Sequence, residues 1–136
     1  MDIICKKLRS VKKYGFVFLF GSFCYGALEI AWRDYTHPAM LILGGLCLLM
    51  IYFSEERFGK NFHAFLRAAI YALMITFFEF LCGLVLNLGL GLDIWDYTPL
   101  PFNLMGQICV RFSILWFLLS AFCIYLCKAL RFLFGT

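Results

Sequence analysis

The chain has 136 residues, of which 64% are hydrophobic and 15% are charged, and its formal net charge is +4. A soluble domain has roughly 45–50% apolar and about 25% charged residues. A soluble chain of this length could not cover so much apolar surface with its own polar groups. The composition therefore excludes an ordinary soluble domain and predicts an all-α integral membrane protein, with one domain over residues 1–136.

Residues 1–13 form a short basic segment before the first apolar run. The basic residues are Lys6, Lys7, Arg9, Lys12 and Lys13. Such a segment suits the anionic cytoplasmic surface of a membrane, so we expect it to be interfacial. A signal peptide is the alternative. The long apolar run that follows, and the glutamate within it, favour a retained span.

We expect four membrane spans, at residues 14–32, 39–53, 65–92 and 104–127. The first is long enough to cross a hydrocarbon core of about 30 Å. Its Ser22 and Gly26 form a face of small residues that can admit a neighbouring helix. The second span is short, so it either tilts within a thinned bilayer or is re-entrant. Gly44 and Gly45 in its middle either kink it or permit close packing.

The distribution of basic residues predicts the orientation of the spans. Basic residues are concentrated in the N-terminal segment, in the stretch 54–63 and in the tail after residue 127, whereas the alternate polar segments hold only Arg33. Because Lys and Arg accumulate on the cytoplasmic side, this pattern predicts a four-helix bundle with cytoplasmic N and C termini. A three-span model would place the basic middle stretch on the same side as the acidic loop 92–106.

Three ionisable residues lie deep inside the expected spans, namely Glu29, Glu79 and Arg111, whereas Arg67 is close enough to the cytoplasmic end of its span to reach the surface. An ionisable residue there costs roughly 2.5–3.5 kcal/mol, which makes each a candidate functional residue. Helix rise places all three in the outer half of the bilayer, where Arg111 can pair with one carboxylate. The other glutamate is then protonated, or faces water, a cation or a substrate amine. Asn87 and Gln107 extend this predicted polar pocket outward. The alternative is an ion pair that only fixes helix packing.

The loop 92–106 is the polar, proline-containing break between the last two spans. Pro99 and Pro101 prevent a regular helix there. We expect Asp96 to accept backbone N–H bonds and Asn103 to cap the last span. The loop is either an acidic vestibule over the polar pocket or simple turn structure. Its candidate residues are Asp93, Trp95, Asp96, Tyr97 and Asn103.

Several kinds of chemistry are not expected. The seven cysteines mostly lie in or beside apolar runs, which disfavours a disulfide framework. His37 and His63 lie in opposite polar turns, so we expect no metal site. No P-loop or hydrolase motif is present, so we expect no enzyme activity and no cofactor. The basic residues follow the topology of the spans, which argues against a nucleic-acid partner.

The stretch 92–116, with WDYT, LPFNLMGQIC and FSILWF, resembles the bacterial family named putative ABC-transporter type IV, the CmpB-type permeases. THPAMLILGGLCLLMIYFSEE at Thr36–Glu56, and FFEFLCG around Glu79, are similar to it as well. The resemblance implies a membrane module of four or five helices in the bacterial inner membrane. Arg111 stands where the family more usually has an uncharged residue.

These observations leave more than one function open. The first is a transporter- or permease-like module, in a homo-oligomer or with other membrane subunits and a separate ATPase. The second is a structural or regulatory membrane protein that assembles with other membrane proteins. A lipid or peptidoglycan-precursor enzyme is less favoured, because no nucleophile or metal set accompanies the acids. A holin-like pore fits the size of the chain, but interior acids and a compact four-helix plan do not specify one. Membrane lipids are expected partners in every case.

Overall fold

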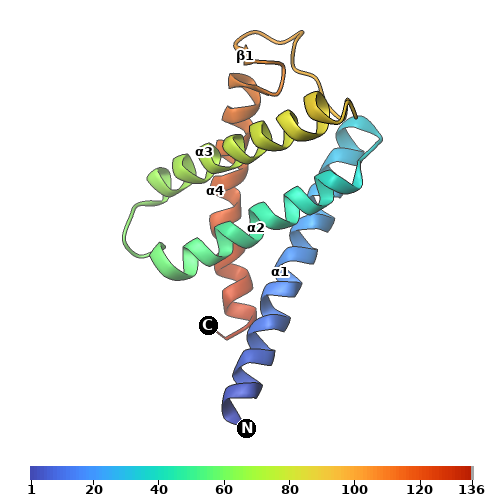
Figure 1. Cartoon of the computed structure of the whole chain (residues 1–136). Coiled ribbons are helices and arrows are strands. Elements are labelled where there is room, and N and C mark those ends of the chain that lie inside the picture. The colour runs from blue at the N-terminus through green and yellow to red at the C-terminus, as the bar shows by residue number, and fades with distance from the viewer. Residues whose placement is uncertain (136) are drawn as a thin grey trace. The chain divides into compact units, whose positions relative to one another are not determined.

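The computed structural model describes residues 1–135. Its helices are α1 (Asp2–Arg33), α2 (Pro38–Phe58), α3 (Ala64–Gly83), the π-helix η1 (Leu84–Gly89) and α4 (Val110–Leu133) (Figure 1). Two short antiparallel strands, β1 (Asn103–Leu104) and β2 (Ile108–Cys109), precede α4. With α3 and η1 taken together, the described residues contain four helices long and apolar enough to cross a membrane. The predicted helical membrane architecture is confirmed at this level, whereas the orientation of the termini stays a prediction.

Several helix ends differ from the predicted spans. α1 begins at Asp2, so the basic segment 1–13 continues directly into the first span. α2 has 21 residues, a length of about 31 Å, so it can cross a membrane without the re-entrant alternative. The predicted start of the last span at Leu104 is wrong, because the β1–β2 hairpin occupies that stretch and α4 begins at Val110.

The chain divides into two compact units, one formed by Met1–Arg57 with the chain from Cys127 onward, the other by Phe58–Leu126. In the first unit, α1 and α2 approach closely through their small residues. A Cβ atom on Gly45 would lie 2.4 Å from the Ser22 hydroxyl oxygen, and one on Gly21 would lie 2.7 Å from the Leu48 Cβ. Ser22 Oγ also donates a hydrogen bond of 2.7 Å to the Leu41 carbonyl. The glycines of α2 therefore serve close packing, as one of the two alternatives predicted.

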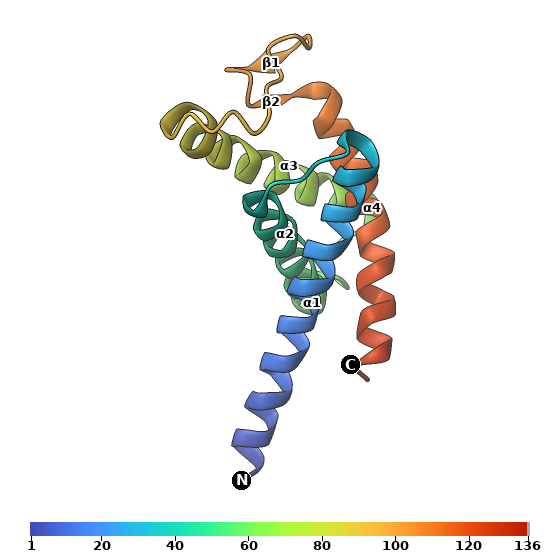
Figure 2. The ribbon, with the colours of Figure 1, turned by 90° about the vertical axis from the view of Figure 1, so that its right-hand side faces the viewer.

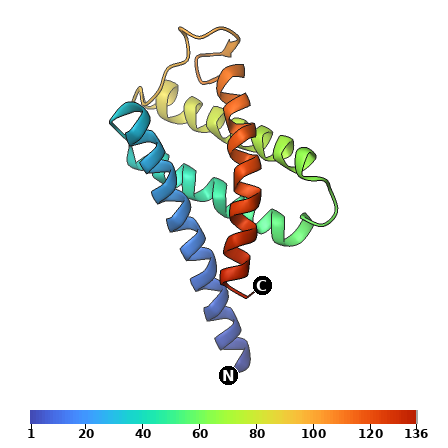
Figure 3. The same ribbon diagram turned by 180° about the vertical axis from the view of Figure 1, so that it is seen from behind.

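The second unit holds α3, η1, the loop, the hairpin and the first part of α4. Figure 2 shows the β1–β2 hairpin where the chain enters α4, and Figure 3 shows α3 and α4 crossing. Side chains join the two helices, because the Thr76 and Ser113 hydroxyl oxygens lie 3.0 Å apart. The Phe65 and Phe117 ring centroids lie 5.3 Å apart.

Large apolar side chains remain exposed on both units. Phe23 is 76% exposed, Leu73 is 72% exposed and Phe122 is 64% exposed. Exposed apolar surface on this scale is unfavourable in water but suits the hydrocarbon core of a bilayer. The outward faces of the helices thus agree with a protein whose solvent is lipid.

Candidate functional site

A buried carboxylate is the centre of the second unit. Glu79 lies on α3 and is only 3% exposed. Tyr97 Oη donates a hydrogen bond of 2.6 Å to its Oε1 atom, and Trp116 Nε1 donates one of 3.0 Å to its Oε2 atom. Burying a carboxylate is costly unless its oxygens are hydrogen-bonded. Both oxygens have a donor here, one from the loop 92–106 and one from α4.

Aromatic packing holds the two donors in place. The Tyr97 ring is stacked on Phe112, with centroids 4.7 Å apart and planes 13° apart. Phe112 in turn lies 6.4 Å from the Trp116 ring. Because Phe112 and Trp116 both belong to α4, one helix supports the loop tyrosine and also supplies the second donor. Glu79, Tyr97 and Trp116 are called the acid–aromatic centre below.

Two amide side chains form a second buried polar contact, between η1 and the residue that precedes β2. Asn87 lies in the π-helix η1, and its Nδ2 atom donates a hydrogen bond of 2.8 Å to Gln107 Oε1. Asn87 Oδ1 accepts a hydrogen bond of 2.7 Å from the Ile94 backbone N–H. Gly83 gives Gln107 room, since a Cβ atom there would lie 2.5 Å from Gln107 Oε1. The prediction placed Asn87 and Gln107 in one polar path, and the structure brings them into direct contact.

The loop 92–106 is anchored at several points along its length. The indole N–H of Trp95 donates a hydrogen bond of 2.9 Å to the Gln107 carbonyl, and the Tyr97 backbone N–H donates one of 2.8 Å to the Gly106 carbonyl. Asp93, Phe102 and Met105 have φ angles of 51°, 55° and 55°. Such left-handed angles are uncommon for residues other than glycine and persist only where the surroundings impose them. The conformation of the loop therefore depends on these anchors.

The remaining loop residues have turn roles. Asp96 Oδ1 accepts from the Thr98 backbone N–H at 2.9 Å and also from the Thr98 hydroxyl. These bonds lower the pKa of Asp96 below its ordinary value of 3.8. The predicted role of Asp96 is confirmed. The predicted capping role of Asn103 is wrong, because its side chain donates 2.8 Å to the Leu100 carbonyl and accepts 3.0 Å from the Gly106 N–H.

Glu29 belongs to the first unit, where residues close to it in the chain donate hydrogen bonds to its carboxylate. Arg33 Nη2 lies 3.1 Å from both carboxylate oxygens, one helical turn away. Tyr25 Oη donates 3.1 Å and Thr36 Oγ1 donates 3.0 Å to the same carboxylate. The Glu29–Arg33 pair was not predicted from the sequence, although side chains four residues apart on a helix are neighbours. The prediction that Glu29 and Glu79 lie at the same depth, in the outer half of the bilayer, stays a prediction.

Arg111 does not pair with Glu79, one of the two carboxylates predicted as its partner. It is exposed in the first turn of α4, while Glu79 is bonded to Tyr97 and Trp116 and Glu29 to Arg33. Uncharged aromatic donors occupy both oxygens of Glu79 instead, whereas the alternative pair between Arg111 and Glu29, which belongs to the other unit, stays a prediction. Trp116 was not predicted from the sequence as a donor to Glu79. The interrupted apolar run FSILWF gave the position of that indole but not its partner.

Within residues 1–135, no three His, Cys, Asp or Glu side chains lie close enough together to hold a metal ion. No disulfide bond joins the cysteines of residues 1–135, and His37 Nδ1 accepts a hydrogen bond of 3.1 Å from the Ala39 backbone N–H. That bond gives His37 a turn role at the start of α2.

No solved structure matches this chain. The family described as putative ABC-transporter type IV matches residues 38–133, a range that begins with α2 and extends through the acid–aromatic centre to the end of α4. The match covers more than half of the chain, as the WDYT and LPFNLMGQIC stretches led us to expect. The helices and the family match together show that this is a multi-pass membrane protein and a member of the putative ABC-transporter type IV family.

Proposed function

We propose that this chain is the membrane-embedded module of an ATP-driven transport system of the bacterial inner membrane, with its termini in the cytoplasm. The module supplies no catalysis of its own, and a separate ATPase subunit powers it. The family match and the four apolar helices support this proposal at the level of a transporter-like membrane protein.

The observation that carries the proposal further is the hydrogen bond between Tyr97 and Glu79. A loop side chain occupies one oxygen of a carboxylate that is 3% exposed. Lifting the loop would free that oxygen for a cation, a substrate amine or a proton. Loop residues that cover a buried acid thus have the arrangement of a lid over a polar site. In this proposal Asn87 and Gln107 hold the lid at its base, through bonds of 2.7 and 2.8 Å.

A second function has its own support. Both oxygens of Glu79 are bonded to donors of the same chain, which is also what a purely structural centre requires. In that case the chain is a structural or regulatory subunit, and Glu79 only fixes the loop for contact with other membrane proteins.

Purification of the tagged chain from its native membranes separates these functions. We expect an ATPase subunit to co-purify and the complex to hydrolyse ATP. Glu79→Gln keeps the side-chain volume but removes the charge, and we expect it to reduce ATP turnover at least tenfold while the partner is retained. Asp34→Asn is the matched control, because Asp34 is exposed at the end of α1 with a φ of 58° that asparagine tolerates. Absence of any nucleotide-hydrolysing partner would refute the transport proposal. Loss of the partner with Glu79→Gln would favour the structural function.

A further inference from the structure

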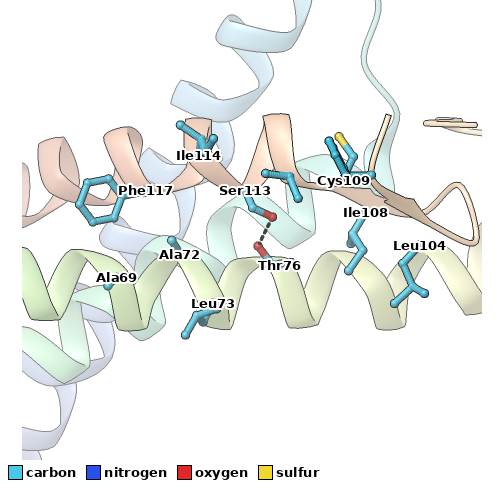
Figure 4. Close-up of a pocket in the computed structure, with 12 residues that line it drawn as sticks. Ala69, Ala72, Leu73, Thr76, Leu104, Ile108, Cys109, Ser113, Ile114 and Phe117 are labelled. Atoms are coloured by element: carbon cyan, nitrogen blue, oxygen red, sulfur yellow. Dashed lines mark hydrogen bonds between the residues drawn. The ribbon is translucent and has the colours of Figure 1, made fainter. Parts of the chain in front are cut away.

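A groove of about 420 Å³ opens in the second unit between α3, the hairpin and the start of α4 (Figure 4). This volume is within the range of roughly 300–1,000 Å³ that small-ligand sites occupy. Its walls are mainly apolar, formed by residues that include Ala69, Leu73, Leu104, Ile114 and Phe117.

The polar groups of the groove are directed at each other. The Thr76 and Ser113 hydroxyls face one another across it at 3.0 Å, as the dashed line in Figure 4 marks. With these two hydroxyls paired, the walls offer mainly hydrocarbon surface to an occupant. Recognition within the groove is therefore by apolar contact.

The rim of the groove is open to the surroundings of the helix pair. Leu73 is 72% exposed, Leu104 is 52% exposed and Ile114 is 58% exposed. Since α3 and α4 are long and apolar enough to cross a membrane, the medium at this rim is lipid hydrocarbon. An acyl chain is the ligand that this medium supplies at the highest concentration.

Charge complementarity indicates the head group. Arg111 directly follows Val110, which lines the groove, and precedes Ser113 by two residues. At about 100° per residue, Arg111 lies on the helix face next to the groove. It is exposed, and no other residue of the described chain 1–135 makes a hydrogen bond or ion pair with it.

A charged residue in the first turn of a membrane-crossing helix lies near the level of the lipid head groups. The planar guanidinium group donates two parallel hydrogen bonds to a phosphate. We propose that the α3–α4 groove binds one anionic phospholipid, with an acyl chain between Ala69 and Ile114 and its phosphate on Arg111. This inference is independent of the proposed transport function, since the lining of the groove includes none of Glu79, Tyr97 and Trp116.

Native mass spectrometry of the full chain tests the proposal. The protein is reconstituted in nanodiscs of equal phosphatidylglycerol and phosphatidylcholine with matched acyl chains, then released, and the retained lipids are counted. We expect one retained lipid per chain, with phosphatidylglycerol favoured severalfold over phosphatidylcholine, because both head groups carry the phosphate but the choline ammonium of phosphatidylcholine offsets its charge and repels Arg111. Arg111→Gln should remove that preference but leave a lipid bound. Lys60→Gln, which removes an exposed charge outside the groove, should behave as the parent protein.

Filling the groove tests the acyl-chain site separately. Ala69→Phe and Ile114→Trp should each lower lipid retention severalfold, and Ala64→Phe on the exposed start of α3 should not. Circular dichroism checks that each variant is folded, and Ile114 is exposed enough for its enlargement to leave the core intact. Retention that is unchanged in both groove variants would overturn the proposal. Equal retention of the two lipids by the parent protein would also overturn it. So would a dimer without bound lipid that dissociates in Ala69→Phe, because a second copy of the chain would then occupy the groove.

Discussion

The hydrogen bond from Tyr97 to Glu79 provides a direct test of the acid–aromatic centre. Tyr97→Phe removes the hydroxyl that lies 2.6 Å from Glu79 Oε1 and keeps the ring that stacks on Phe112 at 4.7 Å. An O–H···O distance of this length is in the range of charge-assisted hydrogen bonds, roughly 2.5–2.7 Å. The substitution therefore isolates one strong bond with little change in packing.

The expected loss can be estimated from the nature of that bond. A hydrogen bond to a charged group contributes about 1.5–3 kcal/mol, and a buried group left without its partner bears the desolvation cost. The free energy of unfolding of Tyr97→Phe should fall by that amount, which is about tenfold to a hundredfold in the unfolding constant. The loop 92–106 should also become more mobile, because Tyr97 is its contact with Glu79.

Reversible unfolding in mixed detergent micelles, followed by tryptophan fluorescence and circular dichroism, measures this loss. Tyr125→Phe is the matched control, since Tyr125 lies on α4 and is 68% exposed. Its change should stay within about 0.5 kcal/mol, as for most surface substitutions. If Tyr97→Phe changed the free energy of unfolding as little as this control does, the acid–aromatic centre would not hold the loop.

Two further predictions concern helix packing and the loop turn. Gly45→Ala should lower the free energy of unfolding by about 1–3 kcal/mol, because its Cβ would lie 2.4 Å from Ser22 Oγ and 2.7 Å from the Phe18 carbonyl oxygen. Gly15→Ala is the control, with no atom within 4 Å of the added Cβ, and a decrease as large as that of Gly45→Ala would refute the packing argument. For Asp96, a pKa lowered from 3.8 by Thr98 means that the carboxylate stabilises the folded turn above pH 3.8 and that this contribution disappears as the pH falls through the lowered pKa. Amide hydrogen exchange at Thr98 should therefore lose protection in strong acid, and Asp96→Ala should show the same low protection at neutral pH. Protection that is unchanged in Asp96→Ala would contradict the Asp96–Thr98 contact.

The sequence carried enough information to place the helices and several buried polar residues. Apolar length identified four helices able to cross a membrane, since a hydrocarbon core of about 30 Å requires about 20 apolar residues. The burial of Glu79, Asn87 and Gln107 followed from their positions inside or beside those apolar runs. The small residues of the first two spans predicted a close helix contact, which the approach of Gly45 to Ser22 bears out.

The partners of those buried groups were not predictable in the same way. Tyr97 and Trp116 reach Glu79 across 18 and 37 residues of chain. Sequence patterning ranked Arg111 as the natural partner of a carboxylate by charge, but the fold directs aromatic donors there and leaves Arg111 at the surface. Charge type alone cannot decide between donors, because the path of the loop determines which one arrives.

The sequence by itself thus determined which segments are helices, which side chains must leave water, and which family the chain resembles, because these follow from local composition and spacing. Only the tertiary structure decided that the loop 92–106 folds back onto Glu79 and that a hairpin replaces the first turns of the last predicted span. It also decided that an apolar groove lies beside an exposed guanidinium group. These features depend on contacts between segments distant in sequence, and such contacts form only when the whole second unit packs.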